Sequence, residues 1–241
     1  MFTVAFIGPD GAGKTTVARH LRETLPVPVK YLYMGVSISS SNTALPTTRM
    51  LHALKRLLSG KKLYSDNDDM DNTPEKDHSN ESLAGRIRRE VKGMLRLMVV
   101  LSEEWYRQLL SSYYKLRGYV IIYDRHFFTD FYGFDIGKQA NRQLLSSRIH
   151  GFMLEHMYPH PDLVIYLDAP GEVLFARKGE KSPEQLEDRR QKFLELCNSK
   201  SNYMIVDATQ DYEKVVAGAT RVIMDFYDAK AGRKKSHATR S

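Results

Sequence analysis

The sequence predicts an α/β protein whose core is a five-stranded parallel sheet with helices on both faces. Short apolar runs of strand character alternate along the 241 residues with longer segments whose apolar residues recur every three or four positions. Two of these runs, at 119–123 and 163–167, are continuously apolar, which is typical of strands buried in parallel sheets. The chain also opens with a strand-like run that leads directly into a glycine-rich turn and a helix-like segment.

Proline and glycine positions set the ends of several predicted elements. Pro26 ends the first helix, Gly118 ends the longest one, and Ser182 followed by Pro183 predicts a capped helix start. The predicted strands are 2–7, 27–34, 119–123, 163–167 and 203–206. The predicted helices are 14–25, 49–59, 83–116, 141–158, 171–177, 183–198 and 212–227.

These elements predict one domain at 1–228, with an insertion at about 35–82. Residues 60–82 break the periodic pattern, and 66–75 within them are acidic and nearly free of large apolar side chains, so we expect a mobile surface excursion there. Residues 229–241 are basic and lack apolar partners, and we expect them to form a disordered tail.

Composition limits the class of protein without identifying a function. The net charge of +7 would suit contact with nucleic acid or a membrane, but binding of several phosphates also needs cations, and part of the charge lies in the tail. The charge alone therefore decides little, and we expect no specific nucleic-acid partner. Cys197 is the one cysteine, which excludes an intrachain disulfide and favours the cytoplasm; we expect it to be buried. No apolar run approaches the roughly 18 residues of a membrane span, so none is expected.

Residues 8–15 read Gly-Pro-Asp-Gly-Ala-Gly-Lys-Thr and match the pattern G-x-x-x-x-G-K-[ST] at every position, between a predicted strand and a predicted helix. Glycines let the backbone turn so that successive N–H groups and the helix start face a polyphosphate. Lys14 would place a cation on the outer phosphates, and the Thr15 hydroxyl would ligate Mg²⁺. The residues predicted to bind these phosphates are Gly8, Asp10, Gly11, Ala12, Gly13, Lys14, Thr15 and Thr16.

Polar residues follow the third predicted strand, at the sheet edge where such proteins bind ligands. Asp124 is predicted to hold Mg²⁺ through water or to accept a proton, and Arg125 to bind an acceptor phosphate. A structural ion pair between the two is the alternative. His126 is interpreted as a structural or rim histidine rather than a catalytic one.

The fourth strand leads to a cationic segment at 177–190 that includes Arg189 and Arg190. Such cations suit a helical lid that closes over a transferring phosphoryl group, and a solvated helix surface is the alternative. The fifth strand ends in a turn, 207–210, that is suited to line a base pocket.

Taken together, four segments resemble the thymidylate kinase family of nucleoside monophosphate kinases. They read Phe-Ile-Gly-Pro-Asp-Gly-Ala-Gly-Lys-Thr-Thr at 6–16, Tyr-Asp-Arg-His at 123–126, Pro-Asp-Leu-Val-Ile-Tyr-Leu-Asp at 161–168 and Val-Asp-Ala at 206–208. The resemblance covers roughly 1–34 and 95–227 and implies a P-loop NTPase fold. It also implies transfer of the γ-phosphate of ATP, with Mg²⁺, to a small-molecule acceptor such as dTMP.

The resemblance implies further roles in the site for ATP. Arg177 would pack on adenine, with Ala208 and Gln210 near its edge. In one branch of the family the phosphate loop carries an arginine, which the Asp-Gly-Ala interior of this loop lacks. The catalytic cation is therefore expected from the lid, and its candidates are Arg189, Arg190, Lys178 and Lys181.

The acceptor half departs from the family pattern. Residues 33–37 read Tyr-Met-Gly-Val-Ser where the family has Arg-Glu-Pro-Gly, and 129–133 read Thr-Asp-Phe-Tyr-Gly where it has an Ala-Tyr-Gln run. Glu103, beside Glu104, stands where the family has an arginine near the thymine. A carboxylate there would repel an anionic nucleotide, face hydroxyl or amine groups of another acceptor, or simply flank a helix.

Two other functions therefore stay open: a kinase of a non-nucleotide acceptor (a sugar, glycolipid or other metabolite), and a non-catalytic NTP-binding regulatory module. Family analogy also favours a homodimer through the 83–116 helix, although its apolar stripe would equally suit packing within the chain.

Overall fold

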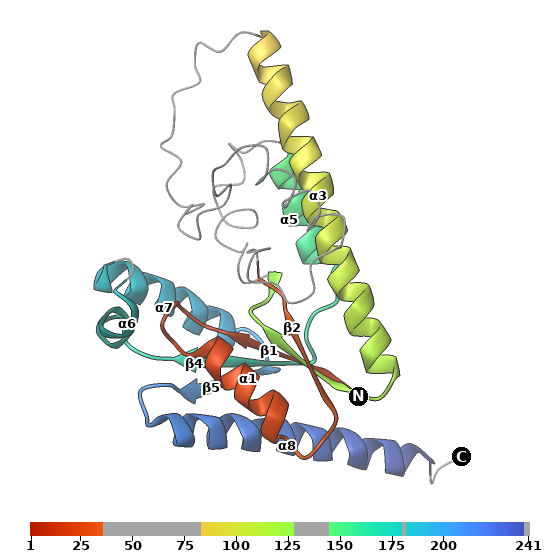
Figure 1. Cartoon of the computed structure of the whole chain (residues 1–241), viewed down its shortest axis with the longest axis vertical. Helices are drawn as coiled ribbons and strands as arrows, with labels where there is room; N and C mark the ends of the chain where they lie inside the picture. The colour runs from red at the N-terminus through yellow and green to blue at the C-terminus, as the bar shows by residue number, and fades with distance from the viewer. Residues whose placement is uncertain (36–82, 128–144, 180–181, 239–241) are drawn as a thin grey trace, which may run out of the picture. The chain divides into compact units, whose positions relative to one another are not determined.

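The structure is a computed structural model that describes residues 1–35, 83–127, 145–179 and 182–238 (Figure 1). The chain divides into two compact units. Unit 1 comprises Met1–Met34, Leu110–His126 and Pro159–Ser241, and unit 2 comprises Gly35–Leu109 and Phe127–Tyr158. The predicted helix at 49–59, the insertion beyond Gly35 and the 129–133 segment lie outside the described residues.

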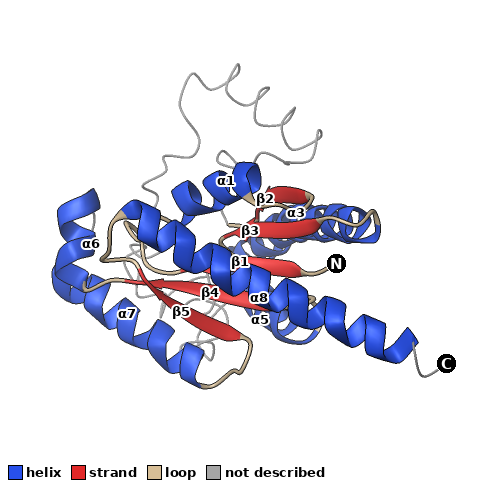
Figure 2. Cartoon of the chain, turned by 90° about the horizontal axis from the view of Figure 1, so that it is seen from below, coloured by secondary structure: helices blue, strands red, loops and turns tan. Residues whose placement is uncertain are grey.

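Unit 1 contains a parallel sheet in the strand order β2-β3-β1-β4-β5, as Figure 2 shows, and the predicted five-stranded sheet is confirmed. Its strands are β1 (Thr3–Ile7), β2 (Val29–Tyr33), β3 (Val120–Asp124), β4 (Leu163–Asp168) and β5 (Tyr203–Asp207). In register, Phe6 of β1 pairs with Asp124 on one side and with Ile165 on the other. The chain therefore crosses from one side of β1 to the other between β3 and β4, and the carboxyl ends of these three strands meet at one edge.

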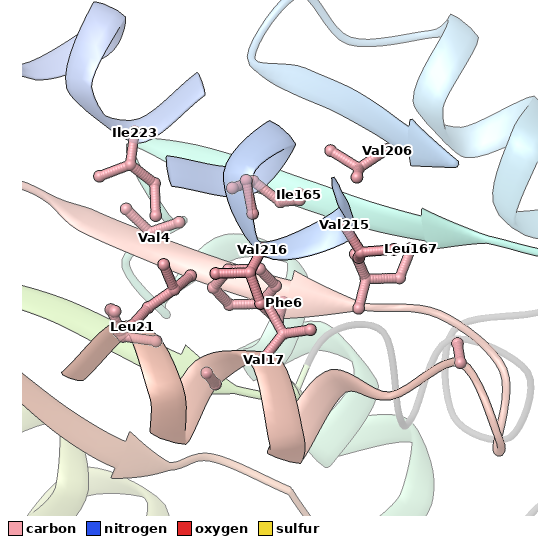
Figure 3. Close-up of a cluster of buried hydrophobic side chains, with 14 of the residues drawn as sticks. Val4, Phe6, Val17, Leu21, Ile165, Leu167, Val206, Val215, Val216 and Ile223 are labelled. Atoms are coloured by element: carbon pink, nitrogen blue, oxygen red, sulfur yellow. The ribbon is translucent and has the colours of Figure 1, made fainter. Parts of the chain in front are cut away.

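Helices α1 (Lys14–Thr24) and α8 (Tyr212–Ala238) pack on one face of this sheet (Figure 3). Alternate strand residues point to that face, as the two-residue period of a strand requires. The buried side chains there include Val4, Phe6, Val17, Leu21, Ile165, Leu167, Val206, Val215, Val216 and Ile223. Removing this apolar surface from water is the main source of the unit's stability.

The other face is covered by α7 (Pro183–Asn198) and by the end of α3 (Leu83–Leu116). The ring of Phe193 in α7 stacks on Tyr166 of β4 with centroids 5.5 Å apart. Ser111 of α3 shares a buried hydrogen bond with Tyr123 of β3. The prediction of helices on both faces is thus confirmed. Cys197 of α7 is buried, as expected.

The helix between β4 and α7 is α6 (Gly171–Lys178). A capping box starts α7, because the Ser182 hydroxyl accepts from the Gln185 N–H while the Gln185 side chain accepts from the Ser182 N–H. Pro183 occupies the first turn, as predicted. The described part of the predicted lid at 177–190 belongs to the end of α6 and the first half of α7, and its candidate cation Lys181 lies outside the described residues.

Helix α8 continues to Ala238 and so includes most of the segment 229–241, for which we expected a disordered tail. Lys230 donates to the Oδ1 atom of Asp162 over 2.7 Å, and its ammonium lies 5.8 Å from the ring centre of Phe2. Phe226, one turn earlier, packs on the same Phe2 ring with centroids 4.9 Å apart. Lys230 thus has partners from distant parts of the sequence.

Unit 2 contains the first part of α3 and α5 (Leu145–His156). Trp105 of α3 contacts Tyr158, with ring centroids 5.4 Å apart. The predicted helix at 141–158 is present from Leu145, and residues 141–144 are outside the described ones. Within the described residues, no helix is both long and apolar enough to cross a membrane.

Candidate active site

The loop after β1 contains glycines in conformations with positive φ angles. Gly8 (φ 145°) and Gly11 (φ 89°) have positive φ angles, which other residues rarely adopt. A Cβ atom on Gly8 would lie 2.8 Å from the Leu167 carbonyl oxygen, and one on Gly11 would lie 2.9 Å from that of Leu174. Both glycines are therefore needed for the loop to pass this close to neighbouring backbone.

The start of α1 is suited to an anion. The helix begins at Lys14 after Gly13, which provides no side-chain cap, and its first turn contains no acidic residue. The first N–H groups of such a helix end carry partial positive charge and lack partners within the helix. Thr15 and Thr16, in this first turn, are half-buried and exposed respectively.

Lys14 is buried, and its ammonium donates to the carbonyl oxygens of Gly8 and Pro9, both over 2.7 Å. Ala12 closes the loop through a hydrogen bond from its N–H to the Pro9 oxygen. The loop thus holds the ammonium at its own centre. Phosphate oxygens could take the place of these carbonyls as acceptors.

Asp10, inside the loop, gathers cations from three elements. Its carboxylate lies 2.8 Å from Arg125 Nη2 after β3, 3.9 Å from Arg189 Nη1 in α7, and 4.0 Å from Lys14 Nζ. Burial alone would raise the pKa of Asp10, but the charges of Lys14, Arg125 and Arg189 outweigh it and hold this pKa well below its usual range. The cations outnumber the carboxylate, so the loop keeps a net positive field for phosphates.

Asp124, the last residue of β3, is fully buried. Its Oδ2 atom accepts a 2.7 Å hydrogen bond from the Tyr31 hydroxyl of β2. Its Oδ1 atom has no hydrogen-bond partner among the described residues. Burial, together with Asp124, raises the pKa of Tyr31, while a hydrogen bond from Arg19 of α1 acts in the opposite direction.

Arg125 has a φ of 66°, which is unusual for a residue with a side chain. Its N–H donates to the Phe6 oxygen over 3.1 Å, which holds the turn against β1 while the side chain reaches Asp10. Strained backbone of this kind is often found at functional sites. The neighbouring His126 is buried, and burial, with His160 adding to it, lowers its pKa to about 3. His126 is therefore neutral at pH 7, which agrees with a structural role.

The two lid arginines face different partners. All three side-chain nitrogens of Arg190 are engaged: Nε and Nη2 donate to Asp168 over 2.7 and 2.9 Å, and Nη1 donates to Glu187 over 3.0 Å. Glu187 also accepts from the Gly171 N–H, so this cluster fastens α7 to α6 and β4. Arg189, in contrast, points to the phosphate loop. Of the two arginines, Arg189 is therefore the one directed at the loop for which we expect phosphate binding.

Two of the residues expected around adenine, Ala208 and Gln210, bond to the ends of β4 and β5. The Ala208 N–H donates to the Asp168 oxygen over 2.7 Å, and the Gln210 side chain donates to Asp207 over 3.1 Å. Arg177 is exposed in the last turn of α6, and within the described part of the chain it has no hydrogen bond to Ala208 or Gln210. A role of these three residues in binding adenine therefore stays a prediction.

Glu103 and Glu104, both buried in unit 2, already have partners there. Glu104 lies 3.1 Å from His150 Nε2 and accepts from the Tyr158 hydroxyl over 2.8 Å. Glu103 lies 3.8 Å from Arg107, which donates to the Gly35 oxygen over 2.9 Å. Both carboxylates thus have partners inside unit 2. Repulsion of an anionic acceptor by these two glutamates is therefore a weaker argument than it is from the sequence alone.

Sequence reasoning missed Tyr31 and Arg107. Arg107 lies one helical turn after Glu103, and this spacing of four residues could have identified the pair. Tyr31 alternates with Tyr33 in an otherwise ordinary strand, so the sequence carries no sign that its hydroxyl meets Asp124.

Among the described residues, no group of three or more His, Cys, Asp or Glu side chains could hold a metal ion. This composition still fits Mg²⁺, which binds through one or two protein oxygens together with phosphates and water. The buried, unpartnered Oδ1 atom of Asp124 is such an oxygen. The Thr15 hydroxyl at the helix start is a second candidate.

Comparison with known proteins places these features in context. A family model for thymidylate kinase matches residues 80–218, more than half of the chain. The chain is 27% identical over 234 residues to a probable thymidylate kinase of Archaeoglobus fulgidus, covering 94% of this chain and 97% of that protein. It is 24% identical over 120 residues to a thymidylate kinase of Thermosipho melanesiensis, covering 46% and 59%. The phosphate loop precedes the segment that the family model matches, so the two indications are independent.

Proposed function

Since the chain belongs to the thymidylate kinase family, we propose that it transfers the γ-phosphate of ATP to a nucleoside monophosphate such as dTMP. Membership implies a nucleotide kinase, and the proposal adds the donor, the metal and the acceptor. The observation that carries it is the approach of Lys14, Arg125 and Arg189 to one carboxylate in the phosphate loop. Phosphoryl transfer needs cations arranged in this way, because negative charge spreads over the moving group.

The loop would bind the phosphates of ATP through its backbone N–H groups and the first turn of α1. The residues proposed for this contact are Gly8, Asp10, Gly11, Ala12, Gly13, Lys14, Thr15 and Thr16. Thr15 and the Oδ1 atom of Asp124 would hold Mg²⁺, directly or through water. Mg²⁺, when bound, neutralises charge on the outer phosphates. Arg177, Ala208 and Gln210 are proposed for adenine.

The cations would act together on the transferring group. Lys14 and Arg189 would stabilise its charge. Arg125 would release its hydrogen bond to Asp10 and bind the phosphate of the acceptor instead. Asp124 orients the metal or the acceptor from its buried position. Arg190 is assigned to holding α6, α7 and β4 together, in place of the catalytic role that the sequence suggests.

A kinase of another acceptor is the second candidate. The observation that favours it is the sequence Tyr-Met-Gly-Val-Ser at 33–37, which stands where the resemblance implies Arg-Glu-Pro-Gly for the nucleotide monophosphate. A regulatory module without transferase activity is disfavoured, because a switch does not need a cationic lid beside the phosphates.

Transfer from γ-labelled ATP tests both candidates, with dTMP, other nucleoside monophosphates, sugars and glycolipids as acceptors. The proposal predicts label on dTMP or another nucleoside monophosphate, and loss of transfer in Lys14→Ala. Label on a sugar or lipid alone would replace the first candidate by the second. Tight ATP binding without transfer to any acceptor would leave only the regulatory module.

We also propose a homodimer formed through α3, whose stripe of exposed apolar residues supports it. Ile87, Val91, Leu95 and Met98 lie on one helical face and are 57%, 54%, 61% and 66% exposed. Light scattering coupled to size exclusion should give a dimer for the native chain and a monomer for Leu95→Glu. Met157→Glu, at an equally apolar position 52% exposed, is the control. A monomeric native chain at micromolar concentration would refute the dimer.

A further inference from the structure

Asp124 offers only one of its two oxygens to a ligand. The side chain is fully buried, and the Tyr31 hydroxyl donates to Oδ2 over 2.7 Å. Oδ1 is also buried, and it has no hydrogen-bond partner among the described residues. Buried carboxylate oxygens are nearly always satisfied, so an unsatisfied one next to a phosphate loop indicates a ligand.

The sheet itself fixes this asymmetry. Tyr31 of β2 pairs in register with Ile122, two residues before Asp124 on β3, so the two side chains share one face. A tyrosine can reach such a diagonal neighbour on the adjacent strand. β3 is buried along its whole length, and although β2 lies at the edge of the sheet, Tyr31 itself is only 7% exposed. Its ring belongs to the buried core cluster, which restricts movement of the hydroxyl away from Asp124.

Which oxygen is free matters for the choice of metal. Mg²⁺ requires nearly ideal octahedral geometry and takes few protein oxygens, whereas Ca²⁺ accepts carboxylates through both oxygens and tolerates more ligands. A carboxylate with one oxygen already engaged is a poorer partner for Ca²⁺ than for Mg²⁺. The hydroxyl of Tyr31 therefore bears on metal selectivity as well as on the orientation of Asp124.

We propose that Tyr31 is a positioning residue that keeps Oδ2 of Asp124 engaged, leaves Oδ1 as the metal-facing oxygen, and thereby favours Mg²⁺ over Ca²⁺ at the phosphate loop. This inference rests on the proposed function, because it requires a metal–nucleotide complex at the loop. Tyr31 does not touch the nucleotide; it acts through Asp124.

The test is the affinity for a non-hydrolysable ATP analogue, measured by calorimetry with Mg²⁺, with Ca²⁺ and with a chelator. The variants are Tyr31→Phe and the control Tyr123→Phe. Tyr123 precedes Asp124, and its buried hydroxyl bonds to Ser111 instead. The native chain and Tyr123→Phe should bind the analogue more tightly with Mg²⁺ than with Ca²⁺. In Tyr31→Phe the ratio of the two affinities should fall by about tenfold, as is common when a residue that supports a metal ligand is lost. Affinity in chelator should be equal in all three.

Asp124→Asn provides a second variant, since it removes the charge and keeps the size of the side chain. It should lose the Mg²⁺ preference at least as strongly as Tyr31→Phe. An unchanged ratio of Mg²⁺ to Ca²⁺ affinity in Tyr31→Phe, with a lowered unfolding temperature, would assign Tyr31 a purely structural role and overturn the inference. Absence of nucleotide binding by the native chain would instead overturn the proposed function and this inference together.

Discussion

Replacing Arg189 and Arg190 one at a time should affect catalysis in one case and folding in the other. The two residues are neighbours in α7, but a helix turns by about 100° from one residue to the next, so they face different partners. Arg189 lies 3.9 Å from Asp10 of the phosphate loop. Arg190 holds Asp168 with two hydrogen bonds and Glu187 with a third.

The expected sizes follow from exposure and geometry. The side chain of Arg190 is 22% exposed and that of Asp168 is 17% exposed, which lies between a surface ion pair and a buried one. Arg190→Ala should therefore cost about 2 kcal/mol of unfolding free energy, or about 4–8 °C in unfolding temperature. Arg189→Ala removes a longer, looser contact and should cost less than about 1 kcal/mol. Its turnover should fall by about 10²–10³-fold, as for other cations that stabilise a transition state.

Urea unfolding and steady-state kinetics of both variants, side by side, provide the assay. Arg189→Lys is a useful third variant, because it keeps the charge but loses the planar fork of donors. The reasoning is refuted if Arg190→Ala loses turnover as severely as Arg189→Ala while keeping native stability. It is equally refuted if Arg189→Ala retains full turnover.

Three further outcomes are expected. Lys14→Ala should lower turnover by at least about 10²-fold with little change in the unfolding temperature, and near-native kinetics would contradict its placement. Burial would raise the pKa of Asp162, but Lys230 and Thr3 outweigh it and lower this pKa. The native chain should therefore exceed Asp162→Asn in unfolding free energy, with the full difference present above about pH 5. This difference should shrink as the pH falls below the ordinary value of 3.8. A gap that is constant from pH 7 to 3 would show that the ion pair is unimportant. Gly11→Ala should abolish ATP binding, because its Cβ would lie 2.9 Å from the Leu174 carbonyl oxygen. Gly232→Ala, which has open space around it, should be neutral or stabilising by up to about 1 kcal/mol. Calorimetry measures the ATP binding of both variants, and thermal unfolding measures their stability.

Much of unit 1 could be predicted because its signals are local. The apolar run at 163–167 became β4 with one added residue, Asp168, and the loop pattern at 8–15 depends on neighbouring residues alone. The capping box that starts α7 is also contained in a few residues. Such elements require no knowledge of what they pack against.

What sequence reasoning missed arises from partners that are distant in the sequence. Lys230, in the expected tail, meets Asp162, which lies 68 residues earlier. Tyr31 and Asp124 are 93 residues apart, so nothing near either one signals their contact. The sequence alone gives Arg189 and Arg190 the same role. Their partners differ because the orientation of α7 directs Arg189 to Asp10 in the phosphate loop and Arg190 to Asp168 of β4. Glu104 likewise finds His150 and Tyr158 only through the packing of unit 2.

The most direct measurement of the central claim is the formation of labelled dTDP from γ-labelled ATP by the purified chain with Mg²⁺. The account predicts a product that grows linearly with time and with protein concentration, and that disappears in Lys14→Ala. A native chain that binds ATP in calorimetry but transfers no label to dTMP or to any other nucleoside monophosphate would contradict it.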